Sequence, residues 1–330
     1  MLPQTPAPPT VKTVEDAHDS LRAALEQVGD VLDGVVETAG PARGPMTHLL
    51  ARRGKMLRPR LNLLAGAITS GFPTYSPELA AAAELIHSAS LLHDDVIDEG
   101  QTRRELPATR VVYSNAVSVL AGDHCLTHAM DLIRGVDRDV ALAEALQTVR
   151  DLVEGELLQL ESKGRLVLDE ARYRRVCKLK TAALFVWSAR AGARFAGANE
   201  DEVESFGVFA GHLGTAFQIR DDLLDFTGTA GFGKRLLDDL REGRSTLPLI
   251  LAARERAGLG ARFDALADLD DTRFEEAVGE IAAEVRASGA LELVAQEVAD
   301  RLKESYGVLT SFPASPFRDL LEAQLVALAG

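Results

Sequence analysis

The sequence predicts an all-α protein, a single-domain bundle of helices, and three observations support this prediction. Apolar residues make up 46% of the 330 residues, with abundant Ala and Leu, whereas aromatic residues make up only 5%. Gly and Pro fall mainly at the ends of segments. Apolar residues recur with helical period, and no run of useful length alternates with the period of a strand. Because nothing in the middle of the chain marks a boundary, we expect residues 13–330 to form one domain.

Composition excludes several classes of protein. The net charge of −14 argues against nucleic acid as a partner, so an anionic ligand would need a local basic cluster or a metal ion. Cys125 and Cys177 lack metal-ligand spacing and are expected to be reduced core thiols. Residues 1–12 are Pro-rich, lack the apolar region of a signal peptide and are expected to form a disordered tail. No apolar run reaches the roughly 18 residues of a membrane span, so we predict a cytoplasmic protein.

The first helices lead to a basic segment. Thr13 and Asp16 have the spacing of a capping box, and the helix that they begin should end at Gly40-Pro41. A second helix is expected over 42–52. Lys55 and Arg58 then precede an apolar helix whose first turn suits Pro59. Backbone N–H groups at this helix start, with the two basic side chains, would bind an anion, although a solvated turn is an alternative.

Two identical acidic clusters are the most informative feature of the chain. A helix over 76–98 carries Asp94, Asp95 and Asp98, and a helix over 201–226 carries the same spacing. The members of that second cluster are Asp221, Asp222 and Asp225. Carboxylates three or four residues apart share a helix face and repel one another, and burial in an apolar helix adds a desolvation cost. Oxygen ligands without Cys favour a hard cation such as Mg2+. The alternative is a solvated acidic face, but the repetition of the spacing in two apolar stretches favours the metal.

Other polar side chains interrupt apolar helices near these clusters. His87 lies on the same helical stripe as Asp94, so it either contacts a ligand or is an ordinary surface or core histidine. Arg103 and Arg104 directly follow the first cluster, where they either hold an anionic ligand or balance the charge of Asp98 and Glu99. Further helices are expected over 115–134, 138–162 and 169–197, with four or so more after Leu247. Lys180 and Thr181 interrupt the third of these helices. Because a buried lysine is rarely tolerated unpaired, we expect Lys180 to pair with a ligand anion or with one of the acidic clusters. The Gly-rich segment after the second cluster, which contains Lys234, is expected to form a movable flap.

These motifs occur in an order that resembles the trans-isoprenyl diphosphate synthases of the polyprenyl synthetase family. The resemblance covers about residues 45–320. Its motifs are GK..RP at 54–59, IHSASLLHDDVIDE..TRR at 86–104, LAGD at 120–123, EGELLQL at 154–160, KTAALF at 180–185, FQIRDDLLD at 217–225 and GK....DL.EGRSTLPLI at 233–250. It implies the isoprenoid synthase fold, about a dozen helices around a central apolar cavity, usually as a homodimer, with a heteromer left open.

The resemblance implies an Mg2+-dependent prenyltransferase that condenses isopentenyl diphosphate head-to-tail (1'-4) with an allylic diphosphate. It places Asp94 and Asp98 on two Mg2+ ions and Asp221 on a third, with Lys180 also in the catalytic set. The supporting carboxylates are Asp95, Asp222 and Asp225. The groups implied to contact the allylic diphosphate are Arg103, Lys180, Thr181, Gln218 and Lys234. The groups implied to hold isopentenyl diphosphate are Lys55, Arg58, His87 and Arg104.

Small residues before the first cluster bear on product length. In the family, aromatic residues at the positions of Ala89 and Ser90 stop the growing chain, so their small size here implies an open tunnel and a trans product of about C30–C50. Close helix packing is the alternative explanation for these small residues. Three departures from the family pattern are Met56 for Arg, Arg244 for Lys, and Glu105-Leu106 for Gly after the Arg pair. The competing functions are a geranylgeranyl or farnesyl diphosphate synthase, a class I terpene cyclase and a silent subunit of a heteromer; the complete second cluster argues against the last two.

Overall fold

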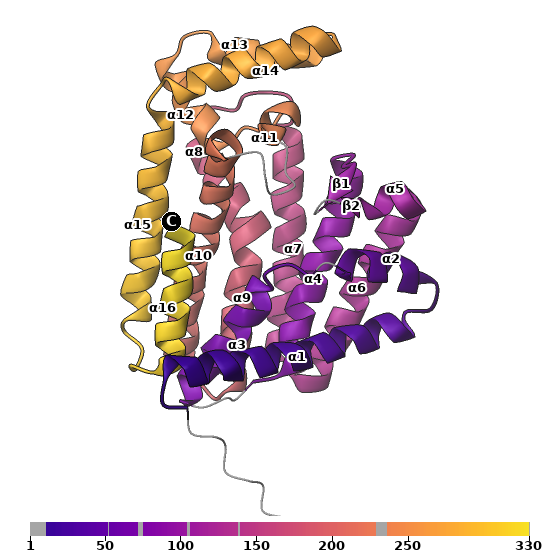
Figure 1. Cartoon of the computed structure of the whole chain (residues 1–330), viewed down its shortest axis with the longest axis vertical. Helices are drawn as coiled ribbons and strands as arrows, with labels where there is room; N and C mark the ends of the chain where they lie inside the picture. The colour runs from indigo at the N-terminus through magenta and orange to yellow at the C-terminus, as the bar shows by residue number, and fades with distance from the viewer. Residues whose placement is uncertain are drawn as a thin grey trace, which may run out of the picture.

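The computed structural model describes residues 11–51, 53–71, 75–103, 106–137, 139–228 and 236–329. These residues are almost entirely helical, which confirms the predicted fold class (Figure 1). The α-helices are α1 (Val14–Thr38), α2 (Arg43–Leu50), α3 (Leu57–Ser70), α4 (Pro77–Ile97), α5 (Thr109–Tyr113), α6 (Asn115–Val136), α7 (Val140–Glu161), α8 (Glu170–Val176), α9 (Ala183–Phe195), α10 (Glu200–Thr227), α11 (Asp238–Arg241), α12 (Leu247–Glu255), α13 (Leu259–Asp264), α14 (Asp271–Arg286), α15 (Ala290–Leu309) and α16 (Pro316–Ala329). Two 3₁₀ helices, η1 (Gly40–Ala42) and η3 (Ala265–Asp268), and a π-helical segment, η2 (Cys177–Ala182), complete the helical elements.

Several helices run along one direction, and others lie across the two ends. Figure 1 shows α4, α7, α9 and α10 along the long axis, with α1 across one end and α14 at the other. Helix α9 contacts α3, α4, α7 and α10, and α4 contacts α1, α3 and α6. The main apolar core lies among these helices. A second, smaller apolar cluster joins α12, α13 and α14 to the end of α10.

Side-chain caps fix where the important helices begin. The Thr13 hydroxyl accepts a hydrogen bond from the Asp16 N–H at 3.1 Å, and the reciprocal bond is also present, so the predicted capping box is confirmed. Ser76 caps α4 in the same way, because its Oγ accepts from the Leu79 N–H at 3.2 Å. Helix α10 begins with a second capping box, formed by Asn199 and Glu202. These caps set the register of the two helices that carry the acidic clusters.

The described residues differ from the sequence predictions in two local elements. A two-residue antiparallel ladder pairs β1 (Thr102–Arg103) with β2 (Leu106–Pro107), where the sequence showed no strand pattern. Such short pairs have too few residues to show a period of two. The helix predicted over 169–197 is continuous but contains the π-helical turn η2, and helical periodicity alone cannot place a π turn.

The predictions for the cysteines, for membrane spans, for the N-terminal tail and for the flap remain to be compared with the structure. Cys125 and Cys177 are both free thiols and buried, as predicted. None of the helices in the described ranges combines the length and apolar character that a membrane crossing requires. The tail predicted for residues 1–12 falls almost entirely outside the described residues, as does the flap predicted around Lys234.

Candidate active site

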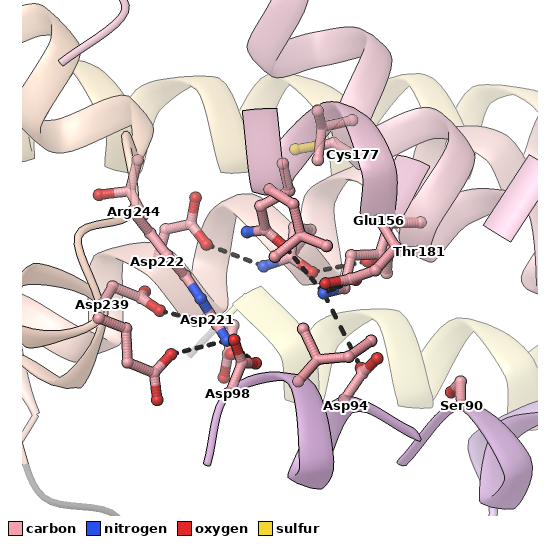
Figure 2. A pocket seen from close by; sticks show the side chains of 18 of the residues that line it. Ser90, Asp94, Asp98, Glu156, Cys177, Thr181, Asp221, Asp222, Asp239 and Arg244 are labelled. Atoms are coloured by element: carbon pink, nitrogen blue, oxygen red, sulfur yellow. Dashed lines mark hydrogen bonds and ion pairs between the residues drawn. The ribbon is translucent and has the colours of Figure 1, made fainter. Parts of the chain in front are cut away.

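A cavity of about 1010 Å³ opens between α4, α7, α8, η2 and α10, and the segment 238–250 covers part of it. Its wall has an apolar part, formed mainly by Leu91, Leu152, Leu157, Leu160, Val176 and Phe217. Both acidic clusters contribute to the other part of the wall. In Figure 2, Asp94 and Asp98 on α4 lie across the cavity from Asp221 and Asp222 on α10. The cavity therefore combines a concentrated negative charge with an apolar interior.

All three carboxyl groups of the first acidic cluster border the cavity, but Asp95 is almost fully buried and is held by Arg103. Two guanidinium nitrogens of Arg103 approach the same Asp95 oxygen, Oδ1, at 2.7 and 2.8 Å, whereas buried Oδ2 has no hydrogen-bond partner among the described residues. Burial raises the pKa of Asp94 to about 6; Lys180 opposes the shift, and Glu156 and Asp98 add to it. Without a bound cation, the negative charge at Asp94 is therefore unfavourable.

In the second cluster, Asp221 and Asp222 line the cavity, but Asp225 does not. Asp222 accepts from the Tyr173 hydroxyl at 2.6 Å and from the Gln218 amide at 2.8 Å. Burial raises the pKa of Asp222 to about 8, and the negative charge of Asp239 adds to the shift. Asp225 is buried and accepts the backbone N–H groups of Asp238 and Asp239 at 3.0 and 3.3 Å. This carboxylate thus caps the first turn of α11, outside the cavity wall.

Lys180 and Thr181 both line the cavity from η2. The Lys180 ammonium forms an ion pair with Glu156, donates to the Gln159 amide oxygen at 2.7 Å and lies 3.8 Å from Asp94. The contact with Asp94 agrees with the expected partner in an acidic cluster, but the ion pair with Glu156, which lies outside both clusters, was not expected. The Thr181 hydroxyl donates to the Gln218 side chain at 2.6 Å.

Two glycines allow the π-helical turn to pack between α7 and α10. A Cβ atom at Gly155 would lie 2.6 Å from the backbone nitrogen of Lys180, and one at Gly214 would lie 2.7 Å from the Cα of Ala182. Such distances are far below van der Waals contact, so both positions require glycine. At Gly211, by contrast, the nearest atom to a Cβ position is 3.7 Å away, which is an ordinary contact.

Arg244 connects the two sides of the acidic cavity. It forms ion pairs with Asp98 and, at 3.2 and 2.6 Å, with Asp239 and Glu242 (Figure 2). Burial opposes the charge of its guanidinium, but the surrounding carboxylates outweigh burial and raise the pKa. Lys163 adds a second cation 3.3 Å from Asp98.

Four side chains that line the cavity were not predicted to do so from the sequence, namely Tyr173, Glu156, Asp239 and Arg244. The sequence did contain a signal for three of them. Glu156 lies in the EGELLQL motif, and the acid pair 238–239 and Arg244 stand in the segment after the second cluster. Nothing local in the sequence indicates that Tyr173 reaches α10.

The group predicted to hold isopentenyl diphosphate is only partly assembled. Arg58 and His87 line the cavity, and the Arg58 guanidinium lies 4.8 Å from the centre of the Phe185 ring. Burial lowers the pKa of Arg58 to about 10, and Glu84 partly opposes this shift. Lys55 is exposed and borders a separate groove of about 550 Å³ beside α1. The backbone turns there through Met56 in the left-handed region, with φ of 49°. Arg104 and Lys234 lie outside the described residues.

The two predicted product-length residues have different environments. Ser90 lines the cavity, and its hydroxyl donates to the His87 carbonyl at 2.8 Å. Ala89 is fully buried and belongs to the main core rather than to the cavity wall. Only Ser90 therefore presents its small side chain directly to the cavity.

The donor set of the cavity fits a hard divalent cation. It offers carboxylate oxygens from two helices, an excess of buried negative charge and the Oδ2 of Asp95, which has no partner within the described part of the chain. Within the described ranges, no three His, Cys, Asp or Glu side chains converge closely enough to chelate an ion by themselves. Mg2+ commonly binds in this way, through one or two carboxylates together with water and phosphate oxygens.

The fold and the paired acidic clusters define the class of isoprenoid synthases, and comparisons with known proteins agree. The family model described as "Polyprenyl synthetase" matches residues 41–285, and the chain belongs to this family. It is therefore a transferase of the prenyltransferase type. The chain is 33% identical over 301 residues to "All-trans-nonaprenyl-diphosphate synthase (geranyl-diphosphate specific)" of Rhodobacter capsulatus, covering 91% of each protein.

Two further relatives show the same similarity. The chain is 32% identical over 275 residues to the octaprenyl diphosphate synthase of Escherichia coli strain K12, covering 83% of this chain and 85% of that protein. The crystal structure of polyprenyl synthase from Caulobacter crescentus CB15, complexed with calcium and isoprenyl diphosphate, superposes with a TM-score of 0.84. It has 32% identity, and the match covers 98% of this chain and 99% of that one.

Proposed function

We propose that this protein is a long-chain trans-polyprenyl diphosphate synthase, which condenses isopentenyl diphosphate head-to-tail (1'-4) with an allylic diphosphate. The observation that carries the proposal is the position of Asp94 and Asp98 opposite Asp221, across one cavity that also contains Lys180. A site of this kind can bind a diphosphate between metal ions and a lysine, with the prenyl chain in the apolar part.

The proposed metal ligands are Asp94, Asp98 and Asp221, and Mg2+ bound there would neutralise charge on the departing diphosphate. Asp95 and Asp222 have supporting roles, because Arg103 holds the first and Tyr173 and Gln218 hold the second. Lys180 and Arg103 would add positive charge at the diphosphate oxygens, and Thr181 would position Gln218 beside them.

The apolar wall has a separate task, because water would quench an allylic cation. Leu91, Leu157 and Phe217 exclude water from the part of the cavity that receives the prenyl chain. Arg58 and His87 would hold the diphosphate of isopentenyl diphosphate so that its double bond attacks the cation. Lys55 and Arg104 complete this group in our proposal, and the lost proton passes to the released diphosphate.

We propose a product of C30–C50. The small side chain of Ser90 at the cavity wall supports this length, as do the names of the nonaprenyl and octaprenyl relatives. A geranylgeranyl or farnesyl diphosphate synthase is the alternative within the same chemistry.

We also propose a cytoplasmic homodimer. Exposed apolar side chains on α6 and α7 that do not line the cavity support an interface there, because Val119, Leu120 and Leu146 are 38%, 65% and 43% exposed. Single exposed apolar residues are common, but three large ones on neighbouring helices favour a protein contact. Light scattering of the purified chain tests the dimer, and a monomer that elongates only with a second protein would favour a heteromer.

Product analysis tests the proposed reaction. The purified chain is incubated with labelled isopentenyl diphosphate, farnesyl diphosphate and Mg2+, and the dephosphorylated products are separated by chromatography. A ladder that ends between 30 and 50 carbons, and is absent with Asp94→Ala, is the expected result. A single 20-carbon product would refute the long-chain assignment, and a cyclised hydrocarbon would refute the synthase.

A further inference from the structure

One basic side chain at the mouth of the cavity belongs to none of the motifs that the sequence analysis assigned. Lys163 lies in the loop between α7 and α8, and its Nζ is 3.3 Å from Oδ1 of Asp98. Arg244 pairs with the other oxygen, Oδ2, through Nη2 (Figure 2). Each carboxylate oxygen of this proposed metal ligand therefore has its own cation in the structure.

Backbone contacts hold Lys163 and Arg244 close to each other. The Gly164 N–H donates to the Gly243 carbonyl at 2.9 Å, and a Cβ atom at Gly243 would lie 2.8 Å from the same Gly164 nitrogen. Gly164 itself has φ of 77°, in the left-handed region that favours glycine. The loop between α7 and α8 is thus joined to the covering segment 238–250 directly beside both basic residues.

The ion pair between Lys163 and Asp98 can be exchanged at little cost. The Lys163 side chain is 36% exposed, and water screens an ion pair whose cation is so open to solvent. Lysine is a compact charge on a flexible stem, so its ammonium can turn to another anion without movement of the backbone. Among the described residues, Asp98 is the acidic side chain with which Lys163 pairs.

Binding of metal ions at Asp98 would release this ammonium toward the substrate. A divalent ion on the Asp98 carboxylate repels a neighbouring cation and takes the oxygen that the cation contacts. The new anion nearest to Lys163 would then be the diphosphate that bridges the metal ions. Lys180 lies 3.8 Å from Asp94, one helical turn away, so the diphosphate would have a basic group at each end of the first cluster.

We propose that Lys163 is a further substrate-binding residue, which holds the diphosphate of the allylic substrate at the Asp98 end of the cavity. This inference rests on the proposed function, in which metal ions on Asp98 bind that diphosphate. It also separates the two substrates. His87, in the group proposed for isopentenyl diphosphate, lies about three turns before Asp98 on α4, or about 16 Å along the axis.

A binding experiment tests this role without turnover. The affinity of the purified chain is measured for Mn2+ alone, by electron paramagnetic resonance, and for inorganic diphosphate at saturating Mn2+, by calorimetry. Lys163→Met should weaken diphosphate binding about tenfold, the loss of one hydrogen bond to a charged group, and Lys163→Arg should retain most of the affinity. The affinity for Mn2+ alone should stay the same or rise in Lys163→Met, because a competing cation has left Asp98.

The matched control is Lys303→Met, which removes an exposed lysine on α15 and should change neither affinity. Equal diphosphate binding by the unaltered protein and Lys163→Met would overturn the proposal. An equal loss of affinity for Mn2+ alone and for diphosphate would also overturn it, because the substitution would then have disturbed the site as a whole.

Steady-state kinetics separates this role from the proposed function. KM for farnesyl diphosphate should rise about tenfold in Lys163→Met, in line with the weaker diphosphate binding, whereas KM for isopentenyl diphosphate should not change. If the unaltered protein elongates prenyl chains and the variant has the same KM for farnesyl diphosphate, only the role of Lys163 is refuted. If the unaltered protein neither elongates nor binds diphosphate with Mn2+, the proposed function fails and this inference fails with it.

Discussion

Replacement of Asp94 by Asn should stabilise the metal-free protein at alkaline pH while abolishing catalysis. The Asp94 side chain is 22% exposed, and its pKa in the folded chain is about 6 against an ordinary value of 3.8. Because the folded state holds this proton more tightly than the unfolded state, the stabilisation by the protonated form is complete below pH 3.8. It is lost as pH rises through about 6.

The magnitude follows from the size of the pKa shift. A difference of about two units corresponds to roughly 3 kcal/mol of unfolding free energy at pH 8. Asn has nearly the shape of Asp and no charge, so Asp94→Asn should recover most of this free energy at pH 8 and little at pH 4. At about 2 °C per kcal/mol for a chain of this length, the thermal midpoint should rise by about 5 °C.

Thermal and urea denaturation in EDTA at several pH values provide the assay, with the exposed Asp131→Asn on α6 as the matched control. Adding Mg2+ with inorganic diphosphate should reverse the ranking, because the unaltered protein gains a ligand that the variant cannot hold. The decisive quantity is the gain in unfolding free energy of Asp94→Asn over the unaltered chain. If this gain is no larger at pH 8 than at pH 4, the claim that ionised Asp94 destabilises the metal-free site is refuted.

Three further substitutions test the supporting structure. Tyr173→Phe removes the hydroxyl that donates to Asp222 of the second cluster at 2.6 Å. The loss of this hydrogen bond, worth roughly 1–2 kcal/mol, should lower kcat/KM for the allylic diphosphate about tenfold. Tyr306→Phe, at an exposed site, is the control and should leave kcat/KM unchanged. Gly155→Ala should lower the free energy of unfolding by about 1–3 kcal/mol and reduce activity, because its Cβ would meet the π-helical turn at 2.6 Å. Gly211→Ala, with 3.7 Å to the nearest atom, is its tolerated counterpart, and equal losses in the two variants would contradict the packing argument. Ser90→Phe should shorten the products seen by chromatography, because the ring would enter the cavity, and an unchanged ladder would show that the prenyl chain does not pass this position.

The sequence was sufficient to predict features that depend only on residues within one helix. The capping box at Thr13, the start of α4 at Ser76 and the facing of Asp94 and Asp98 all follow from local spacing, and the structure has each of them. The π-helical turn was not predictable, because Gly155 and Gly214 make it possible from two other helices. Arg244 shows the same limit, since its charge is visible in the sequence but its ion pair with Asp98 is a tertiary contact.

The second acidic cluster shows why equal spacing does not guarantee equal roles. Asp221 and Asp225 share a helix face just as Asp94 and Asp98 do, yet only Asp221 reaches the cavity. The difference arises where α10 ends. The chain returns there, so that the Leu237 N–H donates to the Asp225 carbonyl at 3.1 Å and the Asp225 carboxylate receives the first N–H groups of α11. An anion at the start of a helix is favourable, so Asp225 gains a partner that Asp98 does not have. Asp98 instead pairs with the cations Arg244 and Lys163. In our proposal, in which a substrate diphosphate and its metal ions replace these cations, the three-residue pattern supplies cation ligands on α4. On α10 the same pattern divides between a proposed cavity ligand and a structural cap that fixes the covering segment.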